Sequence, residues 1–236
     1  MPNAPANDIG PARELDLALV IADLSGYTAL TETHGALRAS EIVLRFCRLV
    51  AASLEPGVSV MNSVGDDVFC AGASTLAVVR SVLRLRDAVA REPQFPRMRT
   101  GIHRGSIVER EGQYFGAPIN LTARLADEAR GGQILCSAPI VEAVRTLALI
   151  EAIPVGEKRF RNVRDPVTVF ELVRSGERRV ASTLDPVCRM QVAIDRAAAT
   201  FAHGGQSYRF CSSECARAFS EAPGRFLAAN AEGRLP

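Results

Sequence analysis

Two aspartates in this sequence have the surroundings of a metal and phosphate site. Asp23 follows an apolar run and precedes a turn that contains glycine and hydroxyl residues, Leu24-Ser-Gly-Tyr-Thr28. Asp66 lies in a second acidic turn, Val64-Gly-Asp-Asp-Val68. Mg²⁺ prefers oxygen ligands and usually engages one or two protein carboxylates together with substrate phosphates. Asp66 alone would suit an ordinary Gly-Asp turn. Asp23 follows a buried apolar run, where an acid is costly unless it has a partner. The pair suggests a two-metal site.

A second candidate group combines a neutral amide with a guanidinium. Asn120 and Arg124 are four residues apart in a segment that is expected to be helical, so both project from one helix face. Such a pair could hold a ribose oxygen and the negative charge that develops on a phosphate. An isolated pair of this kind is more often part of a solvated helix face, so its chemistry depends on the aspartates.

A third group consists of three cysteines near the C-terminus, Cys188, Cys211 and Cys215. If a helix begins near Ser212, Cys211 and Cys215 lie at its N-terminus, where the helix dipole favours thiolate. Three sulfurs, with His203 or Met190 nearby, could bind Zn²⁺ or Cu⁺. Buried thiols without a metal are the alternative. The remaining cysteines, Cys47, Cys70 and Cys136, are interpreted as small buried hydrophobes. His34 and His103 are interpreted as structural residues.

The hydrophobic pattern predicts the elements that position these groups. Leu15–Ala22 is expected to be a buried strand, and a helix is expected from Tyr27 onward. Strands and helices mix without regular βαβ alternation, which favours an α+β fold with a largely antiparallel sheet covered by helices. Further expected segments are a hairpin around Asp66, a helix at Leu76–Ala90, strands at Met98–His103 and Ser106–Glu109, a loop at Glu111–Pro118, a helix at Ile119–Ala129 and an edge strand at Val167–Val173.

Composition limits the class of protein. The chain has 236 residues, 47% hydrophobic content and a net charge of +2 without a basic arm, so neither nucleic-acid binding nor a membrane span is expected. An odd number of cysteines in each half argues against a disulfide framework and indicates the cytoplasm. The expected organisation is a flexible leader (1–13), a large domain (14–174), a linker (175–183), a small domain (184–229) and a tail (230–236).

Four segments together make residues 15–173 resemble the class III nucleotidyl cyclase catalytic domain. They are Ile21-Ala-Asp-Leu-Ser-Gly-Tyr-Thr28, Ser63-Val-Gly-Asp-Asp-Val68, Arg99-Thr-Gly-Ile-His-Arg-Gly105 and Tyr114-Phe-Gly-Ala-Pro-Ile-Asn-Leu-Thr-Ala-Arg-Leu125. The resemblance implies a ferredoxin-like core and a head-to-tail homodimer with sites at its interface. It also implies attack of the ribose 3′-hydroxyl of a nucleoside triphosphate on the α-phosphate, which releases pyrophosphate.

The resemblance also assigns roles to residues. Asp23 and Asp66 would bind two Mg²⁺ or Mn²⁺ ions, and Asn120 and Arg124 would come from the other protomer. Main-chain groups of the turn would hold the triphosphate: Leu24, Ser25, Gly26, Tyr27 and Thr28. The base pocket departs from the family, because Asn62 and Gln113 replace a lysine and an aspartate. Adenine is expected, while guanine, a pyrimidine or a catalytically silent nucleotide sensor are the alternatives.

The C-terminal segment resembles a YHS domain. The resemblance is carried by Asp185-Pro-Val-Cys-Arg-Met190 and Phe210-Cys-Ser-Ser-Glu-Cys215. Arg189 stands where the family usually has glycine after the first cysteine. The cysteines motivate the hypothesis that this domain is a metal- or redox-responsive regulatory or partner-binding element.

Overall fold

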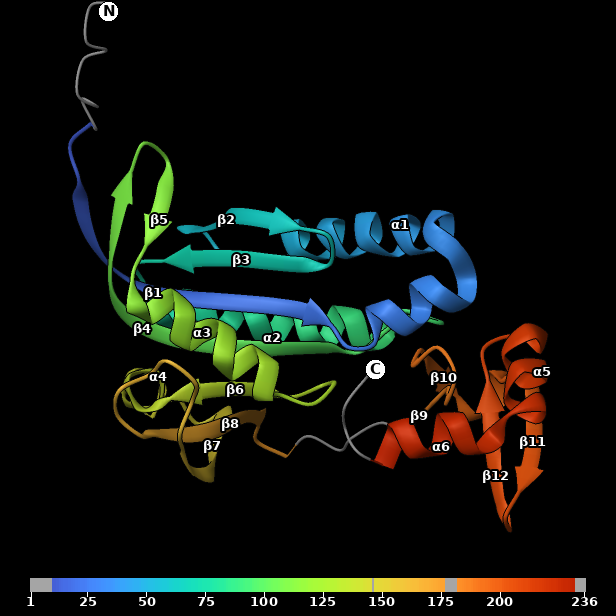
Figure 1. Ribbon diagram of the computed structural model, residues 1–236. Coiled ribbons are helices and arrows are strands. Elements are labelled where there is room, and N and C mark those ends of the chain that lie inside the picture. Colours follow the sequence, from blue (N-terminus) through green and yellow to red (C-terminus); the bar gives the residue numbers. More distant parts are fainter. Residues whose placement is uncertain (1–9, 146, 177–181, 232–236) are drawn as a thin grey trace, which may run out of the picture.

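The computed structural model describes residues 10–145, 147–176 and 182–231. The chain folds into a large α+β domain followed by a small cysteine-containing domain (Figure 1). Most of the expected leader, linker and tail, 1–9, 177–181 and 232–236, lies outside the described residues. Within the described part, no helix is both long and apolar enough to cross a membrane.

The large domain is built on one sheet with the strand order β2-β3-β1-β4-β6-β8-β7, and β5 pairs with β4. Only the pairing of β4 with β6 is parallel among the pairs described in this sheet. This confirms the expected largely antiparallel sheet. The strands are β1 (Arg13–Leu24), β2 (Val58–Val64), β3 (Asp67–Gly72), β4 (Met98–Arg110), β5 (Gln113–Phe115), β6 (Ile134–Ser137), β7 (Ile150–Lys158) and β8 (Val167–Arg174).

Helices cover both faces of this sheet. They are α1 (Tyr27–Ser53), α2 (Thr75–Arg91), α3 (Ala117–Glu128) and α4 (Ala138–Val144). Successive side chains of a strand point to opposite faces, and β1 follows this rule. Val20 and Leu24 belong to the core formed with α1 and α2, whereas Leu19 packs on the other side, where Ile119 of α3 lies.

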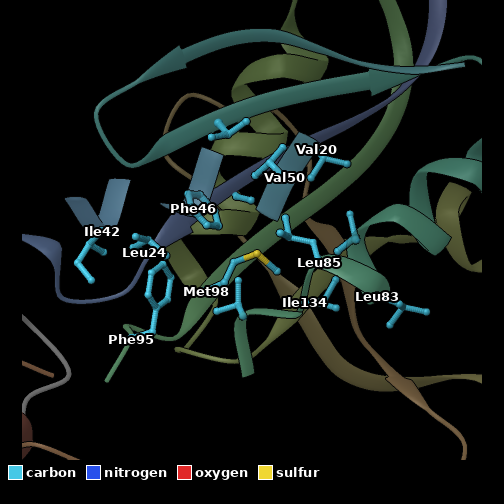
Figure 2. Close-up of a cluster of buried hydrophobic side chains, with 14 of the residues drawn as sticks. Val20, Leu24, Ile42, Phe46, Val50, Leu83, Leu85, Phe95, Met98 and Ile134 are labelled. Carbon is cyan, nitrogen blue, oxygen red and sulfur yellow. The ribbon is translucent and has the colours of Figure 1, made fainter. Parts of the chain in front are cut away.

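The main core lies between the sheet and α1 with α2. Figure 2 shows Val20 and Leu24 of β1 facing Phe46 and Val50 of α1, with Met98 of β4 beside them. All five side chains are buried. Helix α1 has apolar residues at helical spacing, which gives it one buried face. The core therefore fixes the end of β1 against the start of α1.

Three expectations about the sheet were wrong. The segments Met98–His103 and Ser106–Glu109 form one continuous strand, β4, because residues 98–109 pair with β1 along its full length. The expected loop at Glu111–Pro118 contains β5. The expected edge strand β8 lies between β6 and β7, and β7 is the edge. No strand was expected at the position of β7, whose side chains are mostly exposed, so β8 was assigned to the edge of the sheet.

The small domain consists of two hairpins and two helices. Its elements are β9 (Ser182–Leu184), β10 (Gln191–Ala193), a short 3₁₀ helix (Ile194–Arg196), β11 (Ala199–His203), β12 (Gln206–Phe210), α5 (Ser213–Glu221) and α6 (Pro223–Ala231). Phe219 of α5 is fully buried and contacts the rings of Phe201, Tyr208 and Phe210. This domain packs against the large domain, since Val187 and Met190 belong to the same core as Leu24 and Phe95.

Candidate active site and cysteine cluster

The fold brings Asp23 and Asp66 together. Asp23 is near the end of β1, and Asp66 lies in the turn between β2 and β3. Strand β3 runs antiparallel to β1 with Ala22 opposite Val68, so this turn lies beside the end of β1. The Asp66 carboxyl is hydrogen-bonded to the Asp23 side chain and to the backbone of Leu24.

The proximity of the two acids changes the chemistry of Asp66. Burial, the hydrogen bond with Asp23 and the negative charge of Asp23 raise the pKa of Asp66 to about 8. Burial raises the pKa of Asp67 as well, with smaller contributions from Asp23 and Asp127. Two carboxyls that share a proton in this way offer oxygen ligands to a divalent cation, which would replace the proton. The donor set therefore fits Mg²⁺ or Mn²⁺.

Asp23 has a second partner, besides Asp66, that the sequence did not reveal. Arg99 of β4 stands opposite Asp23 in the strand register. Its guanidinium forms a salt bridge with Asp23, in which Arg99 Nε lies 2.6 Å from Asp23 Oδ2. Only the pairing of β1 with β4 brings these residues together, and the sequence carries no signal for that register.

The turn after Asp23 forms the beginning of α1. Gly26 is the N-cap residue in a left-handed conformation (φ 88°), which favours glycine. The N–H of Ser25 donates to the carbonyl oxygen of Arg97 at 2.8 Å. The first N–H groups of a helix, here including those of Tyr27 and Thr28, have no intrahelical acceptor. The turn therefore offers the helix N-terminus that the sequence predicted as an anion site.

Asn120 and Arg124 both lie on α3, as expected. Asn120 is exposed and Arg124 is half-buried. Arg124 Nη1 contacts Asp127 Oδ2 at 3.2 Å, so within one chain its described partner is not Asp23 or Asp66. Asp127 links α3 to the acidic group, because its carbonyl oxygen accepts from Arg99 at 3.5 Å.

The two residues expected to read the base lie on different strands. Asn62 of β2 is exposed, and its Oδ1 accepts from the N–H of Ser63 at 2.8 Å. Gln113 begins β5 and is also exposed. Their neighbours Phe69 and Tyr114 form an edge-to-face contact with ring centroids 6.4 Å apart. The common base pocket of Asn62 and Gln113 stays a prediction.

The three C-terminal cysteines lie together, and a histidine from the large domain joins them. The Sγ atoms of Cys188 and Cys211 are 3.3 Å apart, and those of Cys211 and Cys215 are 3.7 Å apart. His34 Nε2 lies 3.7 Å from Cys211 Sγ and 3.6 Å from Cys215 Sγ. All four potential ligand atoms lie within 4.8 Å of one another.

Of the two additional ligands expected from the sequence, His203 is not in the group of clustered histidine, cysteine and acidic side chains found among the described residues. His203 packs edge-on against the ring of Phe219, and buried Met190 forms a β-bridge with Pro96. The interpretation of His34 as merely structural missed its position beside the thiols. No sequence pattern connects residue 34 with residues 188–215. His103 fits its structural interpretation, since its Nδ1 lies 2.6 Å from Ser137 Oγ.

Local hydrogen bonds hold the cysteines in place. Helix α5 begins after Ser212, whose Oγ accepts from the N–H of Cys215 at 3.2 Å, so the predicted helix start is confirmed. Hydrogen bonds from Cys188 and Cys211 lower the pKa of Cys215. At Cys211 a hydrogen bond from Cys188 lowers the pKa, but the hydrogen bond with Cys215 and burial outweigh it and raise the pKa, so the expected preference for thiolate was wrong for Cys211. By contrast, burial raises the pKa of Cys70 and of Cys136 to about 12, as expected for small buried hydrophobes. Cys47 is only half-buried on α1, so the same expectation was wrong for it.

Comparisons with known proteins agree with this two-domain description. A YHS domain model matches residues 183–230. Over 174 residues the chain is 30% identical to a pH-sensitive adenylate cyclase of Mycobacterium tuberculosis, which covers 72% of this chain and 43% of that relative. An adenylate cyclase of Streptomyces coelicolor is 31% identical over 130 residues, 53% of this chain and 33% of that relative. The chain thus spans less than half the length of these relatives.

Solved structures extend the comparison to the fold. The adenylyl cyclase CyaB of P. aeruginosa aligns with a TM-score of 0.60 and 20% identity over 70% of this chain and 97% of that chain. An adenylate cyclase of Trypanosoma brucei aligns with a TM-score of 0.61 and 20% identity over 70% of this chain and 91% of that chain. The large domain therefore has the fold of class III nucleotidyl cyclase domains and is similar in sequence to curated adenylate cyclases, and residues 183–230 match the YHS domain; they are called the cyclase domain and the YHS domain below.

Proposed function

We propose that this protein is a nucleotide cyclase that converts ATP to a 3′,5′-cyclic nucleotide and pyrophosphate. The observation that carries the proposal is the carboxyl pair of Asp23 and Asp66 beside the N-terminus of α1. Several curated relatives are named adenylate cyclases, which supports the proposal.

In this proposal Asp23 and Asp66 hold two Mg²⁺ or Mn²⁺ ions. When bound, such ions activate the attacking oxygen and stabilise the negative charge of the leaving group. The Asp66 carboxyl must lose its proton to bind a cation, and Arg99 must share Asp23 with it. The N–H groups at the start of α1 hold the triphosphate in place.

Asn120 and Arg124 complete the site from a second protomer. Asn120 is exposed and Arg124 is half-buried on α3, so both side chains have surface that a second protomer can contact. Asn120 would orient the ribose, and Arg124 would stabilise the negative charge on the α-phosphate as it develops. The ribose 3′-oxygen bonds to the α-phosphorus while the bond to the pyrophosphate oxygen breaks, and the hydroxyl proton leaves to solvent.

Exposed apolar side chains support the homodimer in which the two halves of the site meet. Val64 of β2 is 70% exposed and Phe115 of β5 is 56% exposed. A dimer interface that covered these two side chains would remove their apolar surface from water. Each of them is the last residue of a strand that carries an expected base-pocket residue, Asn62 in β2 and Gln113 in β5.

The proposal is tested by incubating the full chain with each of the four NTPs and Mn²⁺. The expected result is pyrophosphate and a cyclic product, with ATP preferred, and loss of both in Asp66→Ala. Asp165→Ala serves as the matched control, because it removes an exposed carboxylate from a loop of the same domain. Nucleotide binding without product from any NTP would instead support the silent sensor, and product from GTP or a pyrimidine nucleotide would replace ATP as the substrate.

We further propose that the YHS domain is a metal-responsive element, with Zn²⁺ or Cu⁺ bound by Cys188, Cys211 and Cys215. Thiolates select soft or borderline cations of this kind. The close approach of the three sulfurs supports the proposal. If the full chain binds neither Zn²⁺ nor Cu⁺ in titrations, this role is wrong.

A further inference from the structure

The cysteine cluster is not confined to the YHS domain. Its sulfurs come from the β9–β10 loop, from the residue after β12 and from α5, whereas His34 belongs to α1 of the cyclase domain. The three cysteines are buried and His34 is half-buried. The fourth potential ligand atom is therefore supplied across the interface between the two domains.

The spacing of these atoms fits a tetrahedral zinc ion. Zn–S distances of about 2.3 Å and Zn–N distances of about 2.0–2.1 Å imply S···S separations of about 3.8 Å and S···N separations of about 3.6 Å in a tetrahedron. The S···S distances are 3.3 Å for Cys188–Cys211 and 3.7 Å for Cys211–Cys215, and the S···N distances from His34 are 3.7 Å to Cys211 and 3.6 Å to Cys215. The two other separations, from Cys188 to Cys215 and to His34, are within 4.8 Å. A Cys₃His set is one of the structural zinc combinations.

A break in α1 accounts for the position of His34. Gly35 has non-helical dihedral angles (φ 77°, ψ 165°) within α1, and the space around its Cα is open. The helix therefore bends directly after His34. The first part of α1, which begins at the phosphate-binding turn, ends at the residue that faces the thiols.

A buried carboxylate positions two of the cysteines. Asp185 is fully buried, and its Oδ1 accepts from the N–H groups of Val187 at 2.8 Å and Cys188 at 3.3 Å. Its Oδ2 accepts from the N–H of Cys211 at 2.7 Å. Asp185 thus ties the loop that carries Cys188 to the residue before α5. Preorganised ligands of this kind are typical of structural metal sites.

Further contacts between the domains surround the same region. The N–H of Gln191 donates to the carbonyl oxygen of Phe95 at 3.0 Å. Gln94 Nε2 donates to the carbonyl oxygen of Cys211 at 2.9 Å. Gln94 and Phe95 both lie in the segment before β4. In the same segment, the carbonyl oxygen of Arg97 accepts a hydrogen bond from the N–H of Ser25. The YHS domain therefore contacts the segment that holds the phosphate-binding turn.

Arg189 connects the cluster to this turn most directly. It follows Cys188 and adopts a left-handed conformation (φ 65°) that favours glycine. A Cβ atom on Gly26 would lie 2.6 Å from Cβ and 2.8 Å from Cγ of Arg189, so the Arg189 side chain lies against Gly26. An arginine in a conformation suited to glycine is thus packed on the N-cap of α1.

We infer that His34 completes a Cys₃His zinc site that fastens the YHS domain to the first part of α1. The zinc ion then links Cys188 to α1 and keeps Arg189 against Gly26. The description of this turn as the phosphate-binding turn rests on the proposed cyclase function, whereas the zinc site does not depend on it.

The experiment uses the full chain without nucleotide and replaces zinc by Co²⁺, whose tetrahedral thiolate complexes absorb strongly in visible light. One Co²⁺ per chain should bind with a tetrahedral spectrum, and Zn²⁺ should displace it. His34→Gln should weaken binding by more than the ~10–100-fold loss that is typical of second-shell changes. His203→Gln, which removes an exposed histidine of the YHS domain, is the matched control and should bind like the unmodified chain.

X-ray absorption on the zinc-loaded unmodified chain gives a second measurement that needs no variant. It should show three sulfur ligands and one nitrogen ligand. Equal metal affinity of His34→Gln and the unmodified chain, four sulfur or oxygen ligands without nitrogen, or no Co²⁺ binding would each overturn the site.

Coupling to the active site has its own readout. Zinc removal should raise the KM for the nucleotide severalfold in the unmodified chain, and much less in Arg189→Gly, which keeps a residue suited to this backbone conformation. If the chain binds Co²⁺ through His34 but forms no cyclic product, the cyclase proposal fails and the zinc site stands. If cyclic product forms and His34→Gln binds zinc normally, the zinc site fails and the cyclase proposal stands.

Discussion

At the residue scale, Asp23, Asp66 and Arg99 form a small charge system at neighbouring strand ends. The charge of Asp23 is compensated by Arg99. Asp66 is hydrogen-bonded to Asp23 and has a pKa of about 8, so it keeps its proton at neutral pH. The arrangement resembles other carboxyl pairs in which two close acids cannot both ionise. A divalent cation removes this conflict, so metal binding and proton release are coupled.

The stability of the metal-free protein should therefore depend on Asp66 in a defined direction. Its pKa rises from 3.8 to about 8 on folding, so the folded state binds more protons than the unfolded state between these values. The contribution is fully present below about pH 4 and is lost as the pH rises through about 8. Asp66→Asn should remove this dependence.

The measurement is thermal unfolding with a chelator at pH values on both sides of this window. At the alkaline end Asp66→Asn should raise Tm by about 2–4 °C, which is ~1 kcal/mol for a chain of this size after solvent screening at a half-exposed site is taken into account. At the acidic end Tm should be unchanged, and Mn²⁺ should no longer stabilise the variant. Parallel Tm curves for both proteins would contradict the assignment.

The base pocket is also a question of single residues. Asn62 and Gln113 are both exposed in one chain, and an amide can donate to or accept from a purine edge. The double change Asn62→Lys with Gln113→Asp restores the pair that the resemblance associates with adenine. The ratio of kcat/KM for ATP over GTP should rise at least about tenfold, the effect of one net hydrogen bond. An unchanged ratio would show that these residues do not read the base.

At the element scale, the position of α3 depends on its close approach to β4. A Cβ on Gly101 would overlap the carbonyl oxygen of Thr122 and lie 2.5 Å from the N of Ala126, both backbone atoms of α3. Only a residue without a side chain permits this packing. The strand β4 that positions Arg99 and the helix α3 that carries Asn120 and Arg124 thus meet at Gly101.

Gly101→Ala should destabilise the cyclase domain for this reason. Backbone atoms cannot move as a flexible side chain can, so the unfolding free energy should fall by about 1–3 kcal/mol, the range for overpacked cores. Gly224→Ala is the matched control, because no heavy atom lies within 4 Å of an added Cβ there. Denaturant unfolding checks the difference, and equal stability of the two variants would disprove the close approach.

At the scale of the whole molecule, the proposed active site requires two chains. Asp66 and Arg124 would serve the same site from opposite protomers of a symmetric dimer. Inactive Asp66→Ala and inactive Arg124→Ala chains should therefore complement each other when they are mixed. Random pairing makes half of the dimers mixed, and each mixed dimer has one intact site of two, so about a quarter of the unmodified activity should return.

The control is a mixture of Asp66→Ala with Asp23→Ala. Both chains lack a metal ligand, and each mixed site contains one such defect, so activity should stay absent. Activity of the Asp66→Ala and Arg124→Ala mixture no higher than that of its components, despite dimer formation, would place both residues in sites made by a single chain.

The local elements around the site followed from sequence patterns. The apolar run before Asp23 predicted β1, the glycine turn predicted the start of α1, and Ser212 predicted the start of α5. These signals depend on neighbouring residues, because strand alternation, helix caps and turns are local effects. The continuity of β4 was missed because Gly105 suggests a turn, although here it accommodates Pro118 of α3.

Residue types and their local spacing identified the groups that could do chemistry: two aspartates for divalent cations, an amide and guanidinium pair, and three thiols. How these groups combine depends on tertiary contacts. The register of β1 with β4 gave Asp23 its partner Arg99, the burial of Asp66 beside Asp23 raised the pKa of Asp66, and the docking of the YHS domain placed His34 beside the cysteines. These contacts join residues far apart in the chain, and the packing of a shared core rather than any local pattern fixes their distance.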